Sequence, residues 1–332
     1  MKTKLYDTSD KSIKECARIL RAGGLVAIPT ETVYGLGANA LDEKAVAKVF
    51  EAKGRPADNP LIVHIADFWQ AEDLAADIPP VARVLVGAFT PGPLTLVLPK
   101  NPSVPDIVTA GHSTVAVRIP SNDTALRLLA ECNFPICAPS ANLSGRPSPT
   151  TAAHVLEDLD GRIDAVIDGG ACAVGVESTV IDVTTSPPRI LRSGGVSAED
   201  LRRVIGEVEE YSGDSGIALA PGMKYRHYAP KCDMYYAAYS TRMHNKINAF
   251  YDGLTKTKKP VILCTDANAA RYGTRDVITV GKAAKDYARN VYAALRAAEK
   301  SYGAIIAEGV EDSGIGRSII NRLIKASGGK LV

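Results

Sequence analysis

Apolar and polar positions along residues 11–206 follow two periods. Apolar residues recur every three or four positions at 11–22 and 42–54, which predicts helices that end at Gly23-Gly24 and Gly54. The same period predicts helices near residues 67–76, 80–89, 123–132, 150–159 and 197–206. Short runs of apolar and β-branched residues predict strands at 25–30, 60–65, 94–99, 115–120, 135–140, 165–170, 178–184 and 189–194. Because the last three strands follow one another without a helix between them, the pattern favours a mixed α/β sheet.

A cleaner alternation begins after residue 233. Strands predicted at 234–239, 260–265, 276–280 and 304–310 alternate with helices predicted at 241–254, 282–301 and 314–327. This order is typical of a small, Rossmann-like, doubly wound α/β domain. Residues 207–233 lack periodicity and contain Gly and Pro, so we interpret them as a linker. The chain is therefore divided into an N-terminal domain (1–206), a linker (207–233) and a C-terminal domain (234–332).

Composition favours a globular protein over a membrane-spanning or secreted one. The chain has 332 residues, of which 46% are hydrophobic and 23% charged, as in ordinary globular proteins. It contains no apolar run of about 18 residues and no apolar signal-peptide core at its start, so neither a membrane-spanning helix nor a secreted protein is predicted. The six cysteines form no C-x-x-C pair, which indicates neither a zinc site nor a disulfide framework and favours a cytoplasmic location.

Charge is distributed unevenly between the two halves. Residues 231–332 carry 17 Lys and Arg against 9 Asp and Glu, a net charge of +8, whereas residues 1–230 carry 22 against 28, a net charge of −6. A basic C-terminal domain is compatible with an ordinary solvated surface or with an acidic partner such as RNA. Charge alone does not decide between these alternatives.

Polar residues follow the first predicted strand. PTETVYGLGANA (29–40) contains Gly35 and Gly37 but lacks the third glycine of a dinucleotide-binding loop, so that motif is excluded. The hydroxyls of Thr30 and Thr32 stand at the carboxyl end of a strand, where they either stabilise a turn or bind a small ligand.

Cations stand at several helix and strand ends. Lys53 and Arg55 end one helix ahead of a loop with Asn59, where they either complement the helix dipole or hold phosphate oxygens. Arg118 lies inside an apolar strand, so its charge needs an anion from a protein carboxylate or from a substrate. Arg192 ends another strand. These positions alone leave the structural and functional interpretations both open.

A loop of small polar residues follows the strand at 135–140. In CAPSANLSGRPSPT (137–150), Ser140 and Asn142 stand two residues apart, and main-chain N–H groups in such a loop can cradle anions. No G-x-S-x-G elbow, no H-E-x-x-H motif and no Cys/His cluster occurs, so neither a serine nucleophile nor a protein-bound metal is predicted. Cations and hydroxyls without a nucleophile–base pair indicate a site that positions a polyanion, as nucleotidyl transfer requires.

Six segments occur in a distinctive order along the chain. They are PTETVYGLGANA (29–40), KGRPADNPLIVHI (53–65), PGPLTLVL (91–98), VAVRIPSN (115–122), APSANLSG (138–145) and GVESTVIDV (175–183). Over about residues 10–205 this order resembles the YrdC/Sua5 family, the L-threonylcarbamoyladenylate synthases. The linker and residues 232–332, with GIGRSIINRLIKASG (314–328), resemble the longer, two-domain Sua5 form.

The resemblance implies an N-terminal open, twisted α/β sheet with a large cavity, and a nucleotidyltransferase reaction. L-Threonine, bicarbonate and ATP would give threonylcarbamoyl-AMP and pyrophosphate. A separate threonylcarbamoyl transferase would use the product for the t6A modification of position 37 in tRNAs that read ANN codons. ATP would enter as a substrate with Mg²⁺, whose protein ligands the sequence does not identify. We expect at most a weak RNA contact and no membrane contact.

The resemblance also assigns residues to the two substrates. The K-x-R and S-x-N motifs would supply the catalytic residues Lys53, Arg55, Ser140 and Asn142. The residues expected to hold L-threonine are Thr32, His64, Arg118 and Ser178, with Arg118 on the carboxylate. The residues expected to line the ATP pocket are Lys53, Arg55, Asn59, Thr114, Ala138, Ser140, Asn142, Ser148, Arg192 and Tyr228.

The linker stretch APGMKYRHYAPK (220–231) is too rich in aromatic and cationic residues for a plain tether. The resemblance implies that the linker folds back as a lid and that its H-Y-A-P segment, His227–Pro230, closes on the nucleotide through Tyr228. A lid would keep water from a product that hydrolyses easily.

Two other functions fit parts of the chain. A carbamoyl-transfer enzyme of the hydrogenase-maturation kind uses a related domain, but its usual acylphosphatase and zinc-finger segments are not visible. A double-stranded-RNA-binding module would fit the basic C-terminal domain. Its binding would depend steeply on salt, whereas turnover would require threonine and ATP together.

Overall fold

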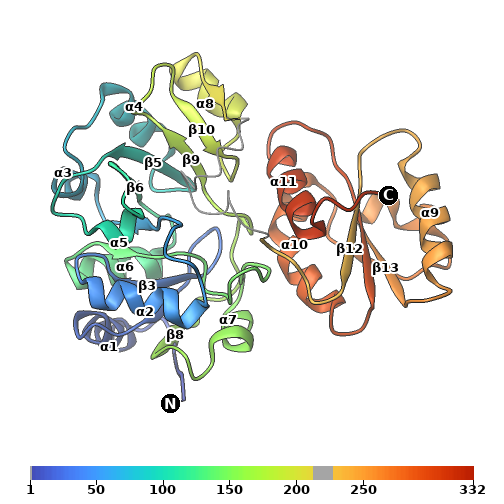
Figure 1. The fold of residues 1–332 in the computed structure, drawn as a ribbon, viewed down its shortest axis with the longest axis horizontal. Helices are drawn as coiled ribbons and strands as arrows, with labels where there is room; N and C mark the ends of the chain where they lie inside the picture. Colours follow the sequence, from blue (N-terminus) through green and yellow to red (C-terminus); the bar gives the residue numbers. More distant parts are fainter. Residues whose placement is uncertain (1, 212–226) are drawn as a thin grey trace. The chain divides into compact units, whose positions relative to one another are not determined.

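The computed structural model describes residues 2–211 and 227–332, which fall into two compact units (Figure 1). Within these residues the first unit comprises 2–144, 149–173 and 177–211, and the second comprises 145–148, 174–176 and 227–332. Two short segments of the N-terminal sequence therefore belong with the C-terminal unit. Residues 212–226 of the predicted linker and lid lie outside the described residues.

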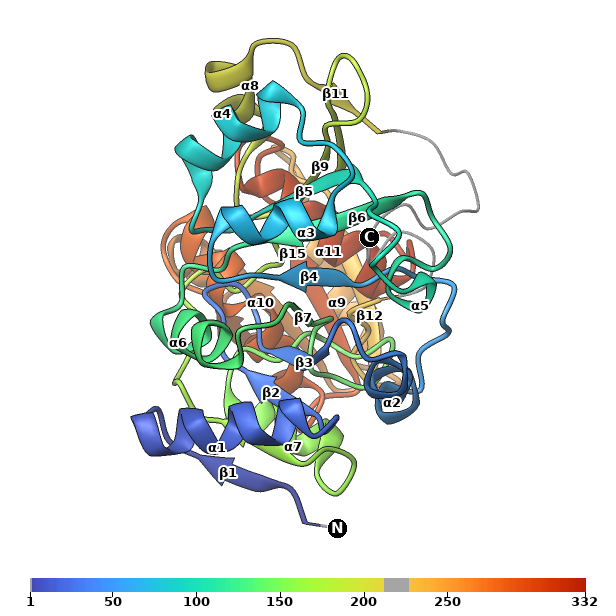
Figure 2. The same cartoon turned by 90° about the vertical axis from the view of Figure 1, so that its left-hand side faces the viewer.

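A large mixed sheet forms the first unit. Within the described residues its strand order is β1-β8-β2-β3-β7-β4-β6-β5-β9-β10-β11, and Figure 2 shows it from β1 at the bottom to β9 near the top. The strands are β1 (Lys4–Tyr6), β2 (Val26–Ile28), β3 (Gly35–Asn39), β4 (Ile62–His64), β5 (Leu94–Pro99), β6 (Thr114–Arg118), β7 (Ile136–Cys137), β8 (Ala165–Ile167), β9 (Thr179–Asp182), β10 (Arg189–Arg192) and β11 (Glu209–Glu210). β6 pairs with β4 in parallel and with β5 antiparallel, so the predicted mixed sheet is confirmed.

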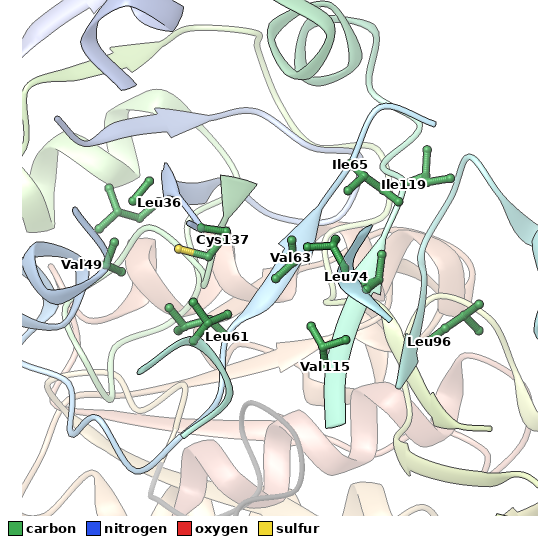
Figure 3. Close-up of a cluster of buried hydrophobic side chains, with 14 of the residues drawn as sticks. Leu36, Val49, Leu61, Val63, Ile65, Leu74, Leu96, Val115, Ile119 and Cys137 are labelled. Atoms are coloured by element: carbon green, nitrogen blue, oxygen red, sulfur yellow. The ribbon is translucent and has the colours of Figure 1, made fainter. Parts of the chain in front are cut away.

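Helices pack on both faces of this sheet. They are α1 (Asp10–Arg21), α2 (Glu43–Lys53), η1 (Phe68–Gln70), α3 (Ala71–Leu74), α4 (Pro80–Phe89), α5 (Asp106–Thr109), α6 (Asp123–Cys132), α7 (Ala152–Leu159) and α8 (Ala198–Ile205). Val26 and Ile28 of β2 pack with α1 and α6, whereas Ala27 between them belongs to the larger core on the other face. Figure 3 shows part of that core, where Val49 of α2 lies near Leu36 and Cys137. The alternation of strand side chains thus fills two apolar layers.

β3 is not among the strands predicted from the sequence, because GLGAN contains no run of apolar or β-branched residues. Residues 35–39 pair antiparallel with β2 and β7, and the two glycines explain why. A Cβ on Gly37 would lie 3.1 Å from the carbonyl oxygen of Val26, and one on Gly35 would lie 3.1 Å from the Cβ of Ala138. Glycine therefore permits the neighbouring strands to lie close together here. In the sequence alone, such glycines are easily taken for loop residues. Glu209 and Glu210, assigned to the linker, instead form the charged edge strand β11.

A parallel sheet with the order β12-β15-β13-β14 forms the described part of the second unit. Its elements are β12 (Asp233–Ala237), α9 (Met243–Leu254), β13 (Pro260–Cys264), η2 (Asp266–Tyr272), β14 (Val277–Thr279), α10 (Ala284–Ala298), β15 (Ala304–Glu308) and α11 (Gly316–Ser327). Figure 1 shows α10 and α11 on one side of this sheet and α9 on the other, which confirms the doubly wound domain. No helix in the described residues has both the length and the apolar character needed to cross a bilayer.

Candidate active site

The K-x-R and S-x-N motifs are joined by hydrogen bonds. Lys53 ends α2 and is buried, and its ammonium donates to the carbonyl oxygens of Ser140 and, at 2.6 Å, of Asn142. In return the N–H of Ser144 donates to the carbonyl oxygen of Lys53 at 2.9 Å. Burial, followed by the charge of Arg55, lowers the pKa of Lys53 well below its ordinary value. Lys53 therefore braces the S-x-N loop from within.

Arg55 and Asn59 form the next part of the site. Arg55 is buried, and its Nη2 donates to the carbonyl oxygens of Asn59 and Pro60 at 3.2 Å each. The Asn59 side chain is 0% exposed, yet neither its Oδ1 nor its Nδ2 has a hydrogen-bond partner within residues 2–211 and 227–332. An unsatisfied buried amide costs free energy, so this position fits a ligand that supplies both a donor and an acceptor.

Arg118 has a protein carboxylate beside it. Its Nη2 lies 2.6 Å from Oε1 of Glu31, and both side chains are less than a tenth exposed. Its Nε also donates to the carbonyl oxygen of Gly92 at 3.3 Å, and the N–H of Ser121 donates to Glu31 Oε2 at 3.2 Å. Glu31 is thus an anion that neutralises Arg118. The sequence by itself left the choice of anion open, and Glu31 was not singled out there.

His64 is a neutral group in this site. It lies opposite Arg118 in the β4–β6 ladder and is 2% exposed. Burial, and then the Arg118 charge, lowers the pKa of His64 to about 3. Its Nδ1 lies 3.2 Å from the carbonyl oxygen of Ile62. His64 can therefore donate or accept a hydrogen bond near neutral pH, but it does not carry a positive charge.

Ser178 is held by two side chains from neighbouring strands. The guanidinium of Arg192 donates to the Ser178 carbonyl oxygen at 2.9 Å and to its hydroxyl at 3.1 Å. The Ser178 hydroxyl also lies 2.7 Å from the hydroxyl of Thr95. Thr95 is 0% exposed and was not identified from the sequence, where it is only one threonine in the apolar run LTLVLP.

Two of the residues predicted to bind threonine, His64 and Arg118, share a face of the central strands. Side chains alternate along a strand, so Thr114 and Arg118 of β6 point to the same side, as does His64 opposite Arg118. Beside these side chains, Ile62, Val97, Ala116, Val180 and Leu191 form a small apolar cluster. Polar side chains thus lie beside a small apolar surface. Such a surface suits a small ligand that has both polar and apolar parts.

The other predicted residues are placed as follows. The hydroxyl of Thr32 lies 2.9 Å from that of Thr30, and the N–H of Ala138 donates to the carbonyl oxygen of Ile62 at 2.9 Å. Ser148 and Tyr228 belong to the second unit, so the structure does not join them to the rest of the site. Within the described ranges, no group of three or more His, Cys, Asp or Glu side chains could hold a metal ion.

Comparisons with known proteins agree over nearly the whole chain. The Sua5–YciO–YrdC family model, described as telomere recombination, matches residues 18–194, and the model described as the threonylcarbamoyl-AMP synthase C-terminal domain matches residues 196–328. The threonylcarbamoyl-AMP synthase of Pyrococcus abyssi is 48% identical over 96% of this chain and 95% of its own. That of Bacillus subtilis is 45% identical over 98% of this chain and 95% of its own.

Solved structures give the same picture. The crystal structure of P. abyssi Sua5 complexed with L-threonine matches with a TM-score of 0.95 and 46% identity, over 99% of both chains. Escherichia coli YciO matches 58% of this chain and 96% of its own with a TM-score of 0.53 and 24% identity, which is a likeness of fold alone.

Proposed function

Because the chain belongs to the Sua5–YciO–YrdC family in its two-domain form, we propose that it synthesises threonylcarbamoyl-AMP from L-threonine, bicarbonate and ATP, for t6A formation in tRNA. Support comes from the 45–48% identity to synthases over nearly the full length. We retain the division into domains at 1–206 and 234–332 with a linker between them. A separate threonylcarbamoyl transferase would consume the product.

The main support for a nucleotide site is the side-chain amide of Asn59, which lies beside Arg55. Within the described residues this amide has no hydrogen-bond partner. The Nδ2 group can donate to a phosphate oxygen, and Oδ1 can accept from a ribose hydroxyl, an adenine amino group or a bound water. Arg55 offers a planar fork for phosphate, and Lys53 holds the Ser140–Asn142 loop in place. These groups favour a nucleotide over an uncharged ligand.

Threonine would lie against the face that carries Arg118, His64 and Ser178. Arg118 has five N–H donors, and the protein acceptors Glu31 and Gly92 use its Nη2 and Nε. A substrate carboxylate would bind the remaining edge of the guanidinium. Glu31 would favour the positively charged ammonium of the same amino acid. The neutral His64 and the hydroxyls of Thr32 and Ser178 would add hydrogen bonds without a second cation.

The proposed chemistry needs no covalent enzyme intermediate. The threonine amine forms a carbamate with bicarbonate, releasing water. A carbamate oxygen then attacks the α-phosphorus of ATP, and the bond to the bridging oxygen breaks so that pyrophosphate leaves. The protein binds and orients the two substrates and stabilises charge on the phosphates through Arg55 and main-chain donors. Mg²⁺ would enter with ATP as part of the substrate and would neutralise phosphate charge.

The test is pyrophosphate release from Mg-ATP and bicarbonate, measured with L-threonine and with serine or valine as controls. Release that requires both threonine and bicarbonate is expected. A folded protein that binds ATP but releases no pyrophosphate under these conditions would overturn the proposal. In that event, RNA binding measured against salt concentration would test the double-stranded-RNA alternative.

A further inference from the structure

The segment that follows the S-x-N loop is held by the C-terminal unit. Residues 145–148 continue directly from Ser144 and belong to the second unit. Within that unit, both nitrogens of the Arg146 fork donate to the carboxylate of Glu299, Nη1 to Oε2 at 2.7 Å and Nη2 to Oε1. The side chains of Arg146 and Glu299 are 14% and 5% exposed. A mostly buried, bidentate pair holds its two side chains in one orientation more firmly than a surface ion pair does.

A second contact reinforces the first. Arg296, one turn before Glu299, is 1% exposed, and its Nη2 donates to the carbonyl oxygen of Pro147 at 2.5 Å. Two consecutive residues of the segment are therefore bound by the end of α10, one through its side chain and one through its backbone.

The same carboxylate also holds the end of the linker. The N–H of Lys231 donates to Oε2 of Glu299 at 2.7 Å, and the N–H of Ala229 donates to the carbonyl oxygen of Gly145 at 2.8 Å. Just before these residues, the ring of Tyr228 stacks on Tyr292 of α10 with 5.3 Å between ring centroids. Glu299 is thus a common anchor for residues 145–148 and for the residue after the H-Y-A-P segment.

We propose that Glu299 is a positioning residue for ATP, because it ties the continuation of the S-x-N loop to the end of the linker. This inference rests on the proposed function, which assigns the S-x-N loop to ATP, and on the family resemblance, which assigns Tyr228 to it. It gives the C-terminal domain a specific role, because α10 holds two chain segments that contain the predicted nucleotide residues Ser148 and Tyr228. Loss of the Glu299 charge would remove the bidentate partner of the mostly buried Arg146 and loosen both segments.

The test compares Glu299→Gln with Glu311→Gln, which neutralises an exposed carboxylate of the same domain. In the pyrophosphate-release assay, Glu299→Gln should raise KM for ATP by about tenfold while KM for threonine changes by less than about twofold. Glu311→Gln should change neither constant. Isothermal titration with a non-hydrolysable ATP analogue should show the same loss of affinity without turnover.

A second variant changes the other member of the Arg146–Glu299 ion pair. Arg146→Ala should also raise KM for ATP, and the double variant with Glu299→Ala should be no worse than Glu299→Ala alone, because that variant has already lost the Arg146 contact. If Glu299→Gln does not fold, the KM for ATP of Arg146→Ala is used to test the inference instead. Unchanged ATP affinity in the folded variants, with an active wild type, would overturn the inference. An inactive wild type would instead overturn the proposed function.

Discussion

Asn59→Leu is expected to raise the stability of the ligand-free protein and to weaken ATP binding. Leucine keeps the branching at Cγ and removes the two polar atoms that have no hydrogen-bond partner within the described residues. An unsatisfied buried polar atom costs about 1–3 kcal/mol, so removing two of them should outweigh the strain of a slightly larger side chain. We expect a net gain of about 1 kcal/mol, or about 2–4 °C in Tm for a domain of this size.

The same substitution removes the hydrogen bonds that ATP would make. A hydrogen bond to a charged group is worth about 1.5–3 kcal/mol, so KM for ATP should rise by roughly 10-fold to 150-fold. KM for threonine should stay unchanged and serves as the internal control. Stability is measured by thermal unfolding without ligands, and affinity by titration with an ATP analogue. A variant that is less stable and binds ATP normally would show that the Asn59 amide has hydrogen-bond partners within the protein and does not hold ATP.

Three further predictions address other parts of the site. Thr95→Val removes the hydroxyl that lies 2.7 Å from that of Ser178, so KM for threonine should rise several-fold with KM for ATP unchanged; equal effects on both would contradict a specific role. The pKa of His64 is lowered to about 3, so the unfolded chain binds a proton that the folded protein excludes between pH 3 and 6.5. Stability should therefore fall as pH falls through this window, by about 1.4 kcal/mol per unit, and His64→Gln should flatten the profile measured by urea unfolding; an unchanged slope would show that His64 is not the cause. Tyr228→Ala should weaken ATP binding more than threonine binding, and unaltered ATP affinity would remove the lid role.

The main elements of both sheets could be predicted because their side chains follow a regular period. The strands that the structure describes in the C-terminal sheet, β12 to β15, were identified in the alternation of apolar runs and amphipathic helices. β3 was missed because Gly35 and Gly37 are needed only where the neighbouring strands β2 and β7 pack closely against them. The sequence does not show which strands lie beside each other. The two-residue strand β11 has no apolar pattern, since it lies at an exposed edge.

The sequence assigned the K-x-R and S-x-N motifs to one site, and the substrate roles of their residues stay a prediction. The K-x-R and S-x-N motifs were expected to act together, and Lys53 does bind the Ser140–Asn142 loop. Glu31 and Thr95 were missed because their roles depend on partners far away in sequence, Arg118 and Ser178. Likewise, no local pattern indicates that residues 145–148 belong with α10, since Arg146 and Glu299 meet only in the folded chain.

The most direct test of the proposed synthesis is detection of threonylcarbamoyl-AMP itself. The protein is incubated with Mg-ATP, L-threonine and ¹³C-bicarbonate. The products are separated, and their masses are measured by mass spectrometry before the adduct hydrolyses. We expect an AMP adduct that carries both threonine and the labelled carbon, formed in step with pyrophosphate. Pyrophosphate and AMP without a labelled adduct, at short times and low temperature, would mean that the protein hydrolyses ATP and does not synthesise threonylcarbamoyl-AMP.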